Sequence, residues 1–219
     1  MKSIIIATFI LTLVAGCSTG IAKKDAFPGM YPNTINSILV LPAVNQSSAA
    51  DAPDLYSSTI LEPLSNAGYY VLPIEITDKI LKNEGISDGE QLANVPAQKF
   101  GQMFNADAVL FVEIDEWKTS YMIVSGSVSV GIKYKLVSTK TNKTLWKYRA
   151  KQVVDTGGDS NNGGGILGAI ISTAINTATQ DYVPIARKVN LIALNSIPFG
   201  KYHIKYDKDK EQKVIEYKD

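Results

Sequence analysis

The hydrophobic and polar positions alternate most regularly between residues 122 and 136. Every even position there is apolar apart from Gly126, and the odd positions from Ser125 to Lys135 are small or charged. A period of two predicts a long β-strand with one face toward the core. A turn at 141–143 leads into a second alternating stretch, Leu145–Val154, so we expect an antiparallel hairpin.

Residues 37–76 have a different pattern, in which two continuous apolar runs flank a stretch of helical spacing. The runs Ile38–Leu41 and Tyr69–Leu72 are typical of strands that are covered on both faces. Between them, Asp51 stands where a helix N-cap is expected and Gly68 where the helix should end. The order strand, helix, strand predicts a βαβ unit with parallel strands.

Helical spacing also dominates residues 74–104 and, beyond a glycine-rich insert at 156–165, residues 167–192. The apolar run Ala106–Asp115 predicts a third strand, with Asp115–Glu116 at its exit. We therefore expect an α/β fold. Its mixed sheet combines an N-terminal βαβ unit with an antiparallel hairpin, and the helices that pack on it include a long C-terminal helix.

The first 20 residues, MKSIIIATFILTLVAGCSTG, follow the order of a secretory signal peptide. A positive charge at Lys2 precedes an apolar run that is too short to span a bilayer, which takes about 20 residues. Val14–Cys17 resembles the lipobox of bacterial lipoproteins. The resemblance implies cleavage between Gly16 and Cys17 and the attachment of diacylglycerol and an N-acyl chain to Cys17. The alternative is an ordinary signal peptide with an incidental cysteine.

Position 18 bears on localisation, because in the lipoprotein sorting pattern an Asp after the cysteine retains the protein at the inner membrane. Ser18 stands there instead, which implies the outer membrane with the domain facing the periplasm; display at the cell surface is the alternative. The expected organisation is a signal peptide at 1–16, a lipidated N-terminus and flexible tether at 17–36, one α/β domain at 37–200 and a charged C-terminal tail at 201–219.

Composition excludes several classes of function. The formal net charge of the 219 residues is +1, and removal of Lys2 with the signal peptide leaves the side chains balanced, so no basic field is available to bind nucleic acid. Cys17 and His203 are each the only residue of their type, which excludes an intrachain disulfide and a Cys/His zinc site. We expect no metal and no cofactor apart from the covalent lipid.

Enzymatic candidates are few. The sequence has no phosphate-binding loop of the P-loop type and no nucleophile elbow. Asp115 and Glu116 remain, at a strand exit near which open α/β sheets bind ligands, with Asn45 in a neighbouring loop. Solvated carboxylates explain them equally well, so we expect a non-catalytic protein. The alternative is binding of a small ligand, or hydrolysis of an envelope substrate, at these strand-end loops.

Two stretches are candidate interfaces. Gly164, Gly168 and Ser172 are spaced four apart, so they form a small-residue face on the predicted C-terminal helix, where a second copy of the chain or the bilayer would make contact. Trp146 and Tyr148 alternate with charged residues and offer an aromatic patch to a partner. The simpler interpretations are a helix packed on its own sheet and a hairpin core that faces inward.

Five stretches together carry a wider resemblance: SILVLPAVNQSS, LEPLSNAGYYVLP, NADAVLFVEI, TNKTLW and GGGILGAI. Over nearly the whole mature chain, the sequence resembles a family of Gram-negative outer-membrane lipoproteins typified by a genome-derived neisserial antigen. The resemblance implies a fold akin to the N-terminal domain of TolB and to the auxiliary lipoproteins of ABC-type transport, without catalytic residues.

The same resemblance implies partners in the envelope. They would be other lipoproteins or subunits of a transport complex, including a protein like the curli secretion channel. We therefore expect an outer-membrane-anchored periplasmic lipoprotein that acts as an accessory or assembly subunit of an envelope transport or secretion complex.

Overall fold

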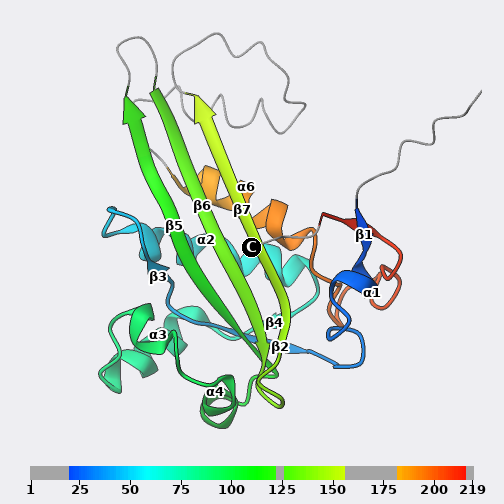
Figure 1. Cartoon of the computed structure of the whole chain (residues 1–219). Coiled ribbons are helices and arrows are strands. Elements are labelled where there is room, and N and C mark those ends of the chain that lie inside the picture. The colour runs from blue at the N-terminus through cyan, green and yellow to red at the C-terminus, as the bar shows by residue number, and fades with distance from the viewer. Residues whose placement is uncertain (1–19, 122–125, 156–181, 216–219) are drawn as a thin grey trace, which may run out of the picture.

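The computed structural model describes residues 20–121, 126–155 and 182–215. These residues form a mixed sheet of six strands in the order β4-β2-β5-β6-β7, with β3 pairing beside β5 (Figure 1). Its strands are β2 (Ser37–Val40), β3 (Val44–Asn45), β4 (Tyr70–Val71), β5 (Ala108–Tyr121), β6 (Gly126–Ser138) and β7 (Thr144–Asp155). The helices packed on it are α2 (Ala52–Asn66), α3 (Ile74–Asn83), the 3₁₀ helix η1 (Gly89–Leu92), α4 (Ala97–Phe104) and α6 (Val183–Leu194).

The predicted βαβ unit is confirmed. Strands β2 and β4 are parallel and α2 connects them. Asp51 occupies the N-cap position, although its side chain makes no capping hydrogen bond. Gly68 follows the helix with φ of +90°, and a Cβ there would lie 2.5 Å from the backbone nitrogen of His203. The chain reverses at this point because only glycine tolerates both the left-handed φ and the close backbone.

The hairpin is also confirmed, since β6 pairs antiparallel with both β5 and β7. The even positions of β6 are buried, as the alternation predicts: Val128, Val130, Ile132, Tyr134 and Leu136. The prediction for β5 was wrong at its C-terminal end. β5 continues through a bulge at Asp115 to Tyr121, because β6 offers hydrogen-bonding partners along this whole length.

The two faces of the sheet carry separate apolar clusters. On one face, α2 and α6 pack residues such as Ile60 and Val189 against Leu110 and Ile132. On the other, α3, η1 and α4 cover only the part of the sheet near the hairpin turn, through Leu81, Leu92 and Phe100 among others. No described helix is both long enough and apolar enough to cross a bilayer.

The prediction of a flexible tether at 17–36 was wrong for its described part. Residues 20–31 and 197–215 together form a compact unit that we call the terminal lobe. In it, β1 (Ile21–Ala22) pairs antiparallel with β8 (Lys213–Val214), and α1 (Lys23–Ala26) follows β1 directly. Phe27 and Met30 are buried in the main core. Such short elements produce no periodicity in the sequence, because each is stabilised by a segment far away along the chain.

The pairing of β1 with β8 also shows that the described part of the predicted C-terminal tail, residues 201–215, belongs to the folded terminal lobe. The expected long C-terminal helix is observed as α6 over Val183–Leu194. The remainder of that prediction, residues 167–181, lies outside the described residues.

Candidate functional site

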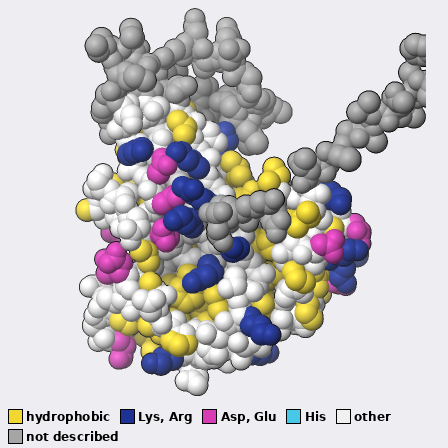
Figure 2. Space-filling view, in the orientation of Figure 1, with side chains coloured by type: hydrophobic (Ala, Val, Ile, Leu, Met, Phe, Trp, Pro, Cys, Tyr) yellow, Lys and Arg dark blue, Asp and Glu magenta, His cyan; other side chains and the backbone are white. Residues whose placement is uncertain are grey.

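The outward face of β5, β6 and β7 carries charges in paired columns. Figure 1 shows α2 and α6 behind these strands and α3 and α4 beside their lower ends. Acidic side chains lie on β5, and basic ones on β6 and β7 pair with them. The pairs are Glu113 Oε1 with Lys133 Nζ at 2.7 Å, Asp115 Oδ2 with Arg149 Nη2 at 2.5 Å and Glu116 Oε1 with Lys151 Nζ at 2.6 Å. We call these six residues the charge ladder, and Figure 2 shows acidic and basic side chains gathered on this face.

A glycine in the middle of β6 makes room for the central pair. A Cβ on Gly131 would lie 2.5 Å from Asp115 Oδ1. Since Gly131 has no side chain, the Asp115 carboxylate extends across β6 and reaches Arg149 on β7. The bulge at Asp115 shifts the alternation of β5 by one residue, so Glu116, opposite Gly131, lies on the same outward face as Glu113 and Asp115.

The ion pairs of the ladder favour the charged forms of Glu116 and Lys133. The hydrogen bond from Lys151 to Glu116 lowers the pKa of that carboxyl, against the opposing effect of burial. Similarly, the hydrogen bond to Glu113 raises the pKa of Lys133. A general acid at neutral pH needs a raised carboxyl pKa. The pairing on Glu116 favours the opposite state.

These contacts correct the predicted location of the acidic pair. Asp115 and Glu116 lie within β5 and not at its exit, and each is paired with a basic side chain of β7. Sequence reasoning missed Glu113, Lys133 and Arg149 as members of the same group. The charged odd positions of the hairpin were the available signal, but only the register of the strands brings them together.

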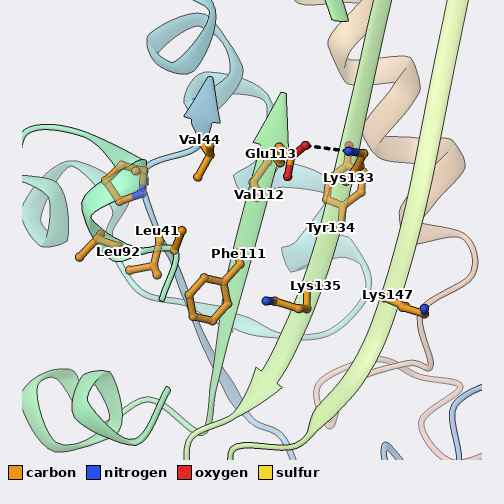
Figure 3. A pocket seen from close by; sticks show the side chains of 13 residues that line it. Leu41, Val44, Leu92, Phe111, Val112, Glu113, Lys133, Tyr134, Lys135 and Lys147 are labelled. Atoms are coloured by element: carbon orange, nitrogen blue, oxygen red, sulfur yellow. Dashed lines mark hydrogen bonds and ion pairs between the residues drawn. The ribbon is translucent and has the colours of Figure 1, made fainter. Parts of the chain in front are cut away.

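A pocket of about 240 Å³ lies where the ladder meets the helical layer (Figure 3). Leu41, Leu92 and Phe111 form its apolar part, and the Glu113–Lys133 pair lies beside them. Lys135 Nζ lies 5.0 Å from the centroid of the Phe111 ring. Ligand pockets commonly measure about 300–1,000 Å³. The smaller volume here suits one inserted side chain better than a cofactor.

Asn45 lies close to the acidic pair, as predicted, because β3 pairs with β5 and places Asn45 opposite Ile114. Its side chain, however, is used within its own loop. Asn45 Nδ2 donates to the carbonyl of Ala49 at 2.7 Å, and Oδ1 accepts from the Ser47 backbone at 3.0 Å. Asn45 therefore stabilises the loop and is not directed at a ligand.

Trp146 is not a surface residue. Only 1% of it is exposed, and its indole Nε1 donates to Ser196 Oγ at 2.9 Å. The aromatic patch was a wrong prediction, and the inward-facing core is confirmed. The other candidate interface, Gly164, Gly168 and Ser172, and the lipidation site at Gly16 and Cys17 lie outside the described residues.

A wider groove of about 670 Å³ is lined by residues of α6, of β8 and of the middle of β7. Its apolar lining includes the exposed side chains of Leu191 and Ile192 on α6.

The described part of the chain brings no three Asp, Glu, His or Cys side chains together as a metal site would require.

Comparisons with known proteins agree on one family. The family described as "Putative lipoprotein GNA1162-like" matches residues 30–197. A protein of Neisseria meningitidis serogroup B, "Putative lipoprotein NMB1124/NMB1162", is 30% identical over 176 residues, which are 80% of each chain. The crystal structure of lipoprotein GNA1162 from Neisseria meningitidis is 32% identical with a TM-score of 0.55, and the match covers 64% of this chain and 96% of that one.

The predicted α/β fold with a mixed sheet is confirmed by the match to the neisserial structure. The PelC dodecamer from Paraburkholderia phytofirmans is more distant, at 15% identity and a TM-score of 0.45 over 77% of this chain and 91% of that one. At that TM-score it supports no statement on assembly or role. The relation to auxiliary lipoproteins of ABC-type transport stays a prediction.

Proposed function

The chain belongs to the GNA1162-like family of lipoproteins, and on that premise we propose that it is an accessory subunit of an envelope transport or secretion complex. In this proposal, the lipid on Cys17 holds the protein at the outer membrane, and the domain faces the periplasm. The protein contributes binding and no chemistry of its own.

The observation that carries this proposal is the charge ladder. All three of its acids are paired with basic side chains of the neighbouring strands, and a pocket of about 240 Å³ lies beside it. An exposed sheet face with ordered charges of both signs and an apolar pocket has the chemistry of a protein interface. Hydrolysis would require a carboxyl whose pKa is raised, whereas the pKa of Glu116 is lowered.

The partner in this proposal is another envelope protein: a lipoprotein, a subunit of a transport complex such as a channel like the curli secretion channel, or a second copy of the chain. Its contact would insert an apolar side chain beside Phe111 and place acidic groups near Lys135, whose side chain is exposed at the rim of the pocket.

Cross-linking in intact cells, followed by identification of the captured proteins, tests this function. We expect an envelope protein to be captured by the unaltered chain and its yield to fall at least fivefold with Lys135→Glu. Lys82→Glu, on the exposed side of α3, is the matched control and should leave the yield unchanged. Capture of no envelope protein, or equal loss with both substitutions, would contradict the proposal.

A further inference from the structure

The most exposed large hydrophobic side chains of the described residues are concentrated in the terminal lobe. Ile204 is 87% exposed, Ile215 is 72% exposed and Tyr202 is 67% exposed, whereas the next in rank, Ile76 on α3, is 58% exposed. Single exposed apolar residues are common on proteins and need no explanation. Their concentration in one small lobe makes this lobe a candidate for contact with an apolar medium.

The same lobe carries four exposed lysines that have no ion pair with another described residue: Lys201, Lys205, Lys208 and Lys213. The remaining lysines of the lobe are paired: Lys23 with Asp209, Lys24 with Glu211 and Lys210 with Asp207. Figure 2 shows hydrophobic side chains beside basic and acidic ones on this lobe, near the start of the described chain.

A buried ion pair holds the lobe together. Lys23 is 0% exposed, and its Nζ donates to the carbonyl of Ile197 at 2.8 Å and to Asp209 Oδ2 at 3.1 Å. The same Nζ lies 4.7 Å from the centroid of the Phe199 ring. The ring of Phe199 stacks on that of His203 with the centroids 3.7 Å apart.

These contacts fix the exposed apolar residues close to the N-terminal strand. Tyr202 and Ile204 flank His203 and are therefore carried on a turn that is stacked against Phe199. Ile215 directly follows Val214, which pairs with Ile21 in β1. All three are thus tied to the segment in which the described part of the chain begins.

The distance to the lipid is short. Cys17 and the first described residue, Gly20, are three positions apart, and an extended chain spans about 3.3–3.6 Å per residue, so the two are separated by no more than about 11 Å. A lipid chain on Cys17 places that residue at the headgroups of the bilayer. The terminal lobe is consequently the part of the fold that the anchor brings to the membrane surface.

We propose that the terminal lobe is a lipid-contacting surface. Ile204, Ile215 and Tyr202 enter the interfacial region of the bilayer, and the unpaired lysines bind the phosphates of anionic phospholipids. This inference rests on the lipidation of Cys17 proposed above, and it goes further by fixing which surface of the domain faces the membrane. The strands that carry the charge ladder, β5, β6 and β7, lie apart from β1 in the terminal lobe (Figure 1), so the proposal leaves the ladder to a protein partner.

Site-specific fluorescence tests this orientation. The chain has a single cysteine, and its sulfur is consumed by the lipid, so an introduced cysteine is the only reactive thiol of the lipidated protein. Ile204→Cys and Ile215→Cys are labelled with an environment-sensitive fluorophore, and Ile76→Cys on α3 is the matched control. The full lipidated proteins are reconstituted into vesicles of phosphatidylethanolamine and phosphatidylglycerol that contain a spin-labelled phospholipid as the quencher.

We expect quenching at positions 204 and 215 to exceed that at 76 at least threefold, and to fall at least twofold when phosphatidylcholine replaces the anionic lipid. Equal quenching at the three positions would overturn the proposed orientation, as would a signal at 204 and 215 that disappears when the protein is diluted, since this indicates contact between copies. Thiol labelling of the unsubstituted protein at Cys17 would instead overturn the lipid anchor and with it the proposed function.

Discussion

At the scale of single residues, one missing side chain determines the arrangement of the charge ladder. The backbone of Gly131 does not have the positive φ that favours glycine. A Cβ at this position would nevertheless overlap the carboxylate of Asp115. The glycine is therefore explained by a neighbour on the adjacent strand. It also explains why a strand with a regular apolar pattern contains a residue that weakens strands in general.

Gly131→Ala should therefore lower the free energy of unfolding by about 1–3 kcal/mol, the usual cost of overpacking. Chemical denaturation measures the effect. The double substitution Gly131→Ala with Asp115→Ala removes the carboxylate that the methyl group would meet, so it should be more stable than the sum of the two single effects predicts. If the free-energy changes of the two single substitutions simply add up in the double variant, the overlap between the methyl group introduced at position 131 and Asp115 is not the cause of the destabilisation.

The buried pair of the terminal lobe acts at the same scale. Lys23→Met leaves Asp209 with the backbone amide of Phe199 and the hydroxyl of Tyr31 as donors but without a cation. Removing one member of a buried ion pair costs about 3–5 kcal/mol, so we expect a loss of this size in chemical denaturation.

Limited proteolysis gives an independent measurement of the same change. Cleavage after Lys24 should become faster in Lys23→Met, because α1 loses its attachment to the C-terminal segment. Lys24→Met removes only an exposed pair with Glu211 and also removes this cleavage site, so it is the control for the denaturation experiment, where its loss of stability should be far smaller than that of Lys23→Met. Similar losses for both variants would contradict the role assigned to Lys23.

At the scale of elements, the outward face of the hairpin is stabilised by cross-strand ion pairs that depend on pH. Lys151 lowers the pKa of Glu116 below its ordinary value of 4.5. A carboxyl whose pKa is lower in the folded state stabilises the fold above its unfolded pKa, and this contribution is lost as the pH falls through the folded value. The ladder should therefore weaken in acid.

We expect the free energy of unfolding to fall as the pH drops below 4.5, the ordinary pKa of a glutamate, and to fall less steeply in Glu116→Gln, which has no proton to gain at this position. Denaturation at a series of pH values measures both slopes. Lys151→Met should reduce the slope in the same direction, because it removes the cation that lowers the pKa. An unchanged slope in both variants would assign the acid sensitivity to other carboxyls.

At the scale of the whole molecule, the fold separates two surfaces. The terminal lobe unites residues 20–31 with 197–215, and the charge ladder lies on the outward face of β5, β6 and β7. An accessory subunit needs both functions at once: one surface directed to the membrane and another that remains accessible to a partner.

Fractionation of cells tests the anchor at this scale. Cys17→Ala has no thiol to acylate, so we expect it to leave the outer-membrane fraction, whereas Lys23→Met should remain there because its lipid is intact. Immunodetection in separated membrane and soluble fractions measures the result. A Cys17→Ala protein that still sediments with outer membranes would show that something other than the lipid retains it.

The sequence by itself determined the elements whose periodicity reflects burial. The alternation in β6, the apolar run of β2 and the helix that ends at Gly68 were all predictable, because each depends on which side of a local element faces the core. The candidate site was predictable only in part. Asp115, Glu116 and Asn45 were correctly brought near one another, but the strand end expected there is the middle of β5.

Only the tertiary structure decided what those residues contact. Strand register sets Asp115 across Gly131 from Arg149, and the fold joins Lys23 to Asp209 over a separation of 186 positions. Neither contact produces a pattern in the local sequence. Each joins two segments that are far apart along the chain, and a periodicity describes only one segment at a time. For the same physical reason, residues 20–31 have the sequence of a loose tether but are folded against the C-terminal segment in the terminal lobe.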